Sequence, residues 1–133
     1  MKVGLAIYNL LTNDSDVNTL VNGRVYPELA KEGAQMPYIV YSVVSNSPSD
    51  TKDGTPIDEA QCEIFTVDKS YQGCNNIADK VRAALDRKGV TVSDASAGDI
   101  AVQSIQYTNE ITEVSADRKT YIAVQDYTFR IKR

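Results

Sequence analysis

The amino-acid sequence predicts an α+β fold, with a mainly antiparallel sheet of about four to five strands, two main helices packed on it and a long β-hairpin arm. Segment 70–89 carries apolar residues at helical spacing, whereas other segments alternate apolar and polar residues as strands do. The predicted order is helix, short strand, two strands, helix, two strands. With 133 residues, the chain is expected to form one domain over 1–133.

The chain is predicted to begin with two helices. The first is amphipathic, with an apolar stripe made of Leu5, Ile7, Tyr8 and Leu11. The second is a short turn of helix for which Asp14 or Ser15 can serve as N-cap, and Asn22 with Gly23 is typical of its end. The sequence "RVY" then indicates a short extended piece that Pro27 stops, because proline has no N–H to donate.

Two strands follow, at 38–44 and 57–68, separated by the polar stretch "NSPSDTKDGTPIDE" at 46–59. The polar segment 28–36 before them is predicted to be a loop or an extended arm. Strand 38–44 is apolar on both faces, which predicts a central strand or one face covered by helices and the other by a neighbouring subunit. Since 46–59 is a poor helix, it cannot be a helical crossover, and the strands should pair antiparallel through a hairpin arm.

The second main helix is predicted within 70–89, with Ser70 as N-cap, Gly89 at the C′ position, and a stripe of Tyr71, Cys74, Ile77, Ala78, Val81, Ala84 and Leu85. Segment 91–99 is interpreted as a loop of small residues. Two more strands, at 100–114 and 120–133, are joined by the charged turn "SADRK". Alternation places Ile105, Tyr107 and Ile111 on one face of the first, and Tyr121, Ala123, Tyr127, Phe129 and Ile131 on one face of the second.

Charge and hydropathy exclude several classes of partner. The formal net charge of -4 predicts a surface that repels phosphate backbones. The basic end "FRIKR" alternates apolar and charged residues, as does a strand with one face in solvent. No apolar run approaches the ~20 residues that cross a bilayer. We therefore expect no membrane association and a protein that stays in the cytoplasm where it is made.

Catalysis, metals and cofactors are not expected. The chain has no histidine, the commonest general base and zinc ligand. The densest carboxylates are Asp50, Asp53, Asp58 and Glu59, in or beside the polar stretch, and with Gly54 they resemble a calcium loop only loosely. Cys62 and Cys74 have no metal or redox spacing and fit as small buried side chains. We predict that the protein is not an enzyme.

The order of these segments resembles a known family. A leading helix with "IYNLLTNDSDVNTLVNGRVYP" is followed by "PYIVY", a hydrophilic hairpin, a strand and the helix "NNIADKVRAALD". This arrangement is similar to the tail-completion proteins of long-tailed bacteriophages, also called tail terminators or head-to-tail joining proteins. The most specific pieces are "GRVYP" and "PYIVY" at their mutual spacing. The resemblance covers nearly the whole chain, although the last third departs most from the family pattern.

The resemblance implies a structural protein of the virion neck, assembled in the host cytoplasm. It implies a homo-oligomeric ring of about six copies that caps the tail tube and binds the head connector or stopper protein, with DNA only in transit through the lumen. The family has no catalytic residues to carry over and implies no cofactor. The alternatives are another head-to-tail connector or adaptor protein, and a small-ligand-binding regulatory α+β domain.

A ring requires each subunit to reach its neighbour, and a polar hairpin arm or the strand edge beside it can do so by adding strands across the interface. Tyrosine is favoured both in half-buried strands and at interfaces, and the chain has eight tyrosines and no tryptophan. The expected interface residues are Asp50, Lys52, Asp53, Gly54, Thr55, Ile57, Tyr38 and Tyr41.

Overall fold

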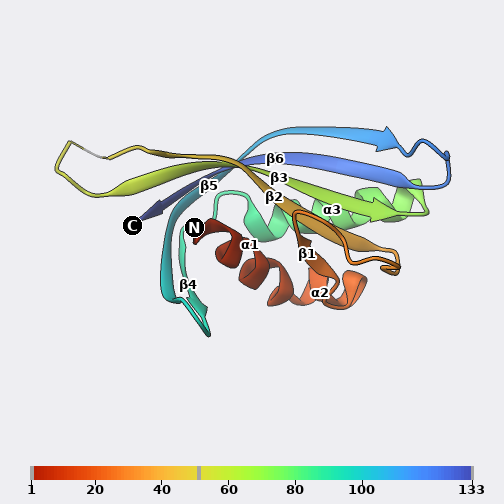
Figure 1. The fold of residues 1–133 in the computed structure, drawn as a ribbon, viewed down its shortest axis with the longest axis horizontal. Helices are drawn as coiled ribbons and strands as arrows, with labels where there is room; N and C mark the ends of the chain where they lie inside the picture. The colour runs from red at the N-terminus through yellow and green to blue at the C-terminus, as the bar shows by residue number, and fades with distance from the viewer. Residues whose placement is uncertain (1, 51, 133) are drawn as a thin grey trace.

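A computed structural model describes residues 2–50 and 52–132. Within them, three helices lie on one face of a six-stranded sheet (Figure 1). In chain order the elements are α1 (Val3–Thr12), α2 (Ser15–Val21), β1 (Val25–Pro27), β2 (Tyr38–Pro48), β3 (Ile57–Asp68), α3 (Tyr71–Leu85), β4 (Val90–Asp94), β5 (Gly98–Val114) and β6 (Tyr121–Lys132).

The sheet confirms the predicted α+β class and its mainly antiparallel pairing. Its strands lie in the order β1-β2-β3-β6-β5-β4. The short β1 runs parallel to β2, and the other neighbours in the sheet pair antiparallel. The two strands that flank the arm are adjacent, as expected, and β6 lies beside β3 at the centre.

The described sheet has one strand more than the sequence predicts, because 91–99 is a hairpin rather than a loop. Val92 is buried in β4, which pairs with the start of β5. The Asp94 carboxylate closes the turn by accepting hydrogen bonds from the N–H groups of Ser96 and Ala97. Gly98 has φ +76°, which favours glycine. Small polar residues concealed this strand because a short strand has few alternating positions.

The core lies between the helices and the sheet, and both contribute buried side chains. The predicted stripe of α3 is confirmed for Cys74, Ile77, Val81 and Leu85, which are all buried, and the Ser70 side chain accepts a hydrogen bond from the N–H of Gly73, as an N-cap does. Asp14 caps α2 in the same way. On α1 the buried side chains are Val3, Ala6, Ile7 and Leu11. The predicted stripes were wrong for Tyr8 of α1 and Tyr71 of α3, which are 41% and 56% exposed.

The end of α3 differs from the prediction. The helix stops at Leu85, and Arg87, with φ +61°, takes the left-handed position that was expected near Gly89. Gly89 is needed for a different reason. A Cβ there would lie 2.8 Å from the Gln103 carbonyl oxygen, closer than ordinary van der Waals contact. Glycine therefore lets the chain pass directly against β5.

The predicted face of β5 is correct for Ile105 and Tyr107 but wrong for Ile111. The pairing register with β6 shifts between Tyr107 and Asn109, which is a β-bulge. The extra residue reverses the alternation, because side chains in a strand point to opposite faces with period two. Glu110 thus turns toward α3, and Ile111 lies 47% exposed on the face without helices.

Candidate functional site

The hairpin arm between β2 and β3 is the feature that projects furthest from the helical layer (Figure 1). The two strands stay paired as far as Pro48 and Asp58, so β2 continues beyond the predicted strand 38–44 into the polar stretch. A bulge between Val43 and Ser45 bends it on the way. The arm is therefore a two-stranded ribbon whose connection is shorter than the polar segment suggested.

Hydrogen bonds shape the end of the ribbon. The N–H of Ser49 donates to the Ile57 carbonyl at 2.7 Å, and the N–H of Ile57 donates to the Asp50 carboxylate at 3.2 Å. The Asp53 carboxylate accepts from both the N–H and the hydroxyl of Thr55, at 3.1 and 2.8 Å. Gly54, with φ +87°, lies inside this turn. The tip is thus an Asx-type turn, which small polar residues form readily.

Residues from β6 hold the base of the arm. The Arg130 Nη1 lies 3.0 Å from a Glu59 carboxylate oxygen and 3.3 Å from the Ser49 hydroxyl. Glu59 and Arg130 are direct partners in the β3–β6 register, so their side chains meet on one face. The sequence predicted that the basic end of the chain is a strand with one face in solvent. One of its charges, that of Arg130, is directed to the arm.

The structure places the eight expected interface residues in three different settings. Asp50, Lys52, Asp53 and Gly54 lie exposed at the arm, with Thr55 half-buried beside them. Ile57 and Tyr41 are buried within the subunit, and the Tyr41 ring packs beside α1 near Gly4. Tyr38 is half-buried on the face without helices. Their assignment to an interface stays a prediction.

A hollow of about 270 Å³ lies on the face without helices, beside Tyr38. It is lined by apolar side chains of three strands together with the loop after β1. The ring of Tyr38 packs edge-to-face against the ring of Tyr26, with the two ring centroids 6.0 Å apart. Leu29, in the segment interpreted as a polar loop, is 82% exposed at its rim. Sequence reasoning missed Leu29. A single large apolar residue within a polar loop was the available signal.

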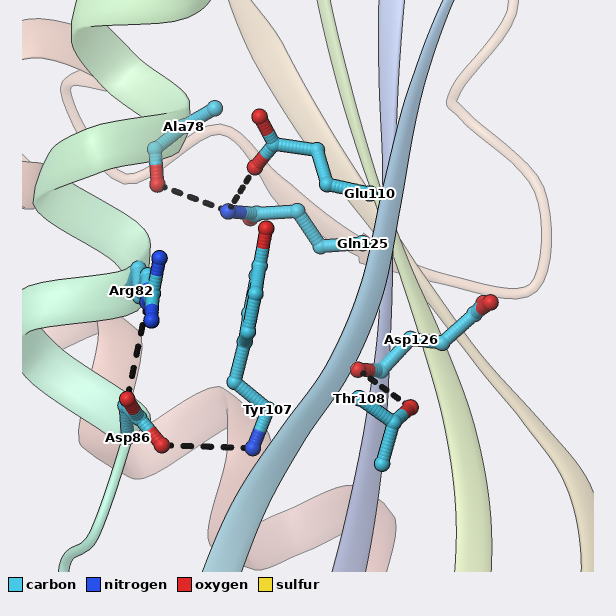
Figure 2. A network of polar contacts seen from close by, with 8 residues as sticks. All are labelled: Ala78, Arg82, Asp86, Tyr107, Thr108, Glu110, Gln125 and Asp126. Carbon is cyan, nitrogen blue, oxygen red and sulfur yellow. Dashed lines mark hydrogen bonds and ion pairs between the residues drawn. The ribbon is translucent and has the colours of Figure 1, made fainter.

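A polar network joins α3 to β5 and β6 (Figure 2). The amide nitrogen of the buried Gln125 donates to the Ala78 carbonyl at 2.9 Å and to Glu110 at 2.7 Å. Arg82 lies over the Tyr107 ring, 3.8 Å from its centroid. The two bonds of the Gln125 amide nitrogen join the helix to the sheet, because a buried donor is costly unless it is bonded, whereas the buried amide oxygen has no partner within the described residues. Sequence alone gave no signal for this network.

The geometry offers no activated nucleophile or metal cluster in the described residues. Burial raises the pKa of the Cys62 thiol to about 12 and also raises that of Cys74, so both stay protonated near neutral pH. Within 2–50 and 52–132, no three acidic or cysteine side chains gather closely enough to hold a metal ion. None of the described helices is both long and apolar enough to span a bilayer.

Comparison with known families adds an observation independent of this geometry. Residues 5–132 match the model of the family described as "Tail completion protein gp17". The chain belongs to this tail completion family. It is accordingly a structural protein of phage tails, and the resemblance seen in its sequence is confirmed. A search of curated proteins gave no match.

A solved structure shows that the fold of this tail completion protein occurs in an assembled particle. A chain from the "Virion of native gene transfer agent (GTA) particle" superposes with a TM-score of 0.77 at 13% identity. The match covers 96% of this chain and 92% of that chain. At such low identity the likeness establishes the fold alone.

Proposed function

We propose that the chain is the subunit of a ring of about six copies that caps the tail tube and joins the tail to the head connector. The observation that carries this proposal is the paired arm, which extends well past the helices and the rest of the sheet (Figure 1). A projecting ribbon fastened to β6 by Arg130 reaches outward with a defined direction. Membership of the tail completion family supports the location in the virion neck, after assembly in the host cytoplasm.

The arm contacts the neighbouring subunit through its tip. Asp50, Lys52, Asp53 and Gly54 lie exposed there, next to Thr55, and they supply donors and acceptors for a partner surface. Tyr41 and Ile57 act from inside the subunit, where Tyr41 supports the sheet and Ile57 supports the base of the arm. The proposed interface thus consists of a polar tip that contacts the neighbour and of two buried residues, Tyr41 and Ile57, that support the strands behind it.

The apolar hollow beside Tyr38 is the second contact surface of the ring. Leu29 loses most of its exposed surface if a partner covers this face, and each apolar Å² removed from water contributes about 25 cal/mol. This proposed arrangement corresponds to the second of the two sequence-based interpretations of β2, in which one face is covered by helices and the other by a neighbour. The tail tube protein and the connector bind the two open ends of the ring.

The ring lets DNA pass without holding it. Each copy has a net charge of -4, so six copies carry about -24 in total (6 × -4). Such a charge disfavours binding of phosphate in the lumen. The ring itself needs no cofactor, metal or enzymatic activity.

Head–tail joining tests this function. Tails made without the chain are mixed with full heads and either the wild-type chain or a variant in which residues 49–56 are replaced by Asn-Gly. A matched control replaces the same residues by glycine and serine without shortening. We expect the wild type to cap the tubes and restore joining, and the shortened arm to fail while its circular dichroism is unchanged. Full joining by the shortened variant would contradict the role of the arm.

The two alternatives give different results in these samples. A connector or adaptor protein would bind heads rather than the ends of isolated tail tubes. A regulatory domain would bind neither and would show a ligand-dependent shift in its thermal unfolding.

A further inference from the structure

The far half of β5 is a strand edge that the described part of the subunit leaves open. β4 pairs only with residues 98–102 of the 17-residue β5. Just beyond, the chain after α3 covers the edge, because the N–H of Arg87 donates to the Ile105 carbonyl at 2.8 Å. The N–H of Tyr107 donates to the Asp86 carboxylate at 3.2 Å (Figure 2). From 108 to 114, β6 is the strand neighbour on one side, and no described strand pairs on the other.

The chemistry of this edge suits pairing with another strand. Natural edges that avoid pairing carry lysine, proline or inward-pointing charges. Residues 109–114, "NEITEV", contain no lysine, arginine or proline, and Ile111 and Val114 are 47% and 54% exposed. The one inward-pointing charge, Glu110, accepts a hydrogen bond from Gln125 of its own subunit, so its side chain is held away from the backbone groups of the edge. β-branched residues such as Ile111 and Val114 favour strands. We expect such an edge to be covered in the assembled protein.

A second open edge lies on β2, at the opposite border of the sheet. β1 pairs with residues 39–41, and the Glu28 carboxylate accepts hydrogen bonds from the N–H of Val43 and the hydroxyl of Ser42. In residues 44–47, β3 is the strand neighbour on one side, with no described strand on the other, and Val44 is 58% exposed. Pro48 limits this edge because it has no N–H.

The directions of the strands make these two edges compatible. β2 is antiparallel to β3, β3 to β6, and β6 to β5, so β2 and β5 run in opposite directions. A sheet that continues from β5 of one copy to β2 of the next therefore forms an antiparallel pair. The two segments also lie toward opposite ends of the molecule, as Figure 1 shows, so the step repeats from copy to copy.

We propose that residues 108–114 of β5 receive residues 44–47 of β2 from a second copy of this chain, giving a sheet that continues around the ring. The inference rests on the proposed ring and names the strands that join its subunits. Such head-to-tail contacts use a different surface on each partner and form a ring when the rotation closes. They would also place the arm of one copy beside the β5–β6 hairpin of the next.

The main rival is a two-fold dimer in which β5 pairs with β5. In a two-fold antiparallel pair, residues directly opposite each other share a face of the sheet, so a pair centred on Ile111 places Glu110 opposite Thr112 and Glu113 opposite Asn109. Such a dimer would cover the edge of β5 but leave the open edge of β2 without a strand neighbour. Residues 44–47 are Val, Ser, Asn and Ser, which bring no charge to the glutamates. Because pairing of β5 with β2 covers both open edges, β2 is the favoured partner.

Cysteine cross-linking under ring-forming conditions tests the pairing. Single variants at β2 (Asn46→Cys) and β5 (Thr112→Cys, Val114→Cys), whose side chains lie on the same face of the sheet as the helices, are prepared with distinguishable tags, then mixed in pairs with tail tubes and oxidised. Cys62 and Cys74 are buried and should stay unreacted. We expect disulfides in β2 plus β5 mixtures and little within either variant alone. An Asn46→Cys, Thr112→Cys double variant should give a ladder of cross-linked oligomers that ends at the ring.

A charge variant provides a second measurement. The double variant Ile111→Lys, Val114→Lys should lower the association constant about tenfold or more, because lysine on an edge strand disfavours pairing with another strand. Val90→Lys, an equally simple change at an exposed valine of β4, serves as the control and should assemble normally. Circular dichroism of each variant shows whether the subunit still folds.

Three outcomes are decisive. Cross-links within Thr112→Cys or Val114→Cys alone would establish the β5 dimer and overturn the inference. A ring visible by electron microscopy but without β2–β5 cross-links would overturn the inference and leave the proposed function intact. Failure to form any ring would contradict both.

Discussion

Arg130 on β6 lies 3.0 Å from the Glu59 carboxylate and 3.3 Å from the Ser49 hydroxyl, so one side chain joins both strands at the base of the arm. The two charged side chains are 32% and 38% exposed. Because water screens such a pair, its contribution to global stability is small, about 0.2–1 kcal/mol. Its effect on the orientation of the arm is the more important consequence.

Arg130→Met should therefore separate arm order from stability. We expect the free energy of unfolding to fall by less than about 1 kcal/mol, while amide exchange in the arm becomes faster because an anchoring contact is lost. Lys132→Met is the control on the same strand. Urea unfolding and hydrogen exchange measure the two effects. Unchanged exchange in the arm would show that Arg130 does not hold it.

Leu85→Ala should destabilise the subunit by about 2–5 kcal/mol, because the leucine is fully buried against the sheet and its removal leaves a cavity. Leu29→Ala removes the same atoms from a side chain that is 82% exposed and should cost less than about 0.5 kcal/mol. Urea unfolding of both variants gives the comparison. Equal losses would mean that α3 does not pack as described.

Gln125→Glu should be strongly destabilising at neutral pH. It places a carboxylate in a buried site beside Glu110, where the amide now donates at 2.7 Å. Burial and the like charge disfavour its ionised form, so we expect a loss of at least about 2 kcal/mol. The raised pKa means that stability is lost as pH rises above about 4.3. The urea midpoints of Gln125→Glu at pH 4.5 and 7.5 should differ by more than those of Gln106→Glu, a control at an exposed position. An equal difference in the two variants would contradict the network.

Stability should also fall in alkaline solution. Burial raises the pKa of Cys62 to about 12, and it raises those of Cys74, Tyr41 and Tyr127. The unfolded chain releases these protons from about pH 8.5 upward, whereas the folded chain retains them. The urea midpoint should thus decrease between pH 7.5 and 10, and by less in Cys62→Ala. A midpoint that stays constant over this range would contradict the burial of these groups.

Sequence reasoning predicted the α+β class, the central strands, the arm and the stripe of α3, because their apolar periodicity extends over many residues. It failed where one residue changes the geometry. The bulge near Thr108 reverses the face of Ile111, and Arg87 rather than Gly89 takes the left-handed position after α3. The strand at 90–94 was missed because five residues give too short a pattern.

The candidate surfaces were only partly predictable. A polar segment between strong strands indicated the arm, but the contact between Arg130 and Glu59 depends on the β3–β6 register, which local sequence does not specify. Likewise, the open edges of β2 and β5 depend on where β1 and β4 stop pairing. Such relationships between distant segments become visible only in three dimensions.

The most direct test of the account is the mass of the assembly at the end of a tail tube. Native mass spectrometry of the full chain, incubated with its tail tube protein and then released, should show one closed species of about six subunits. The variant with residues 49–56 replaced by Asn-Gly should give single subunits of unchanged fold. A wild-type chain that binds the tube as a monomer, or an open series of masses without a closed end point, would contradict the ring.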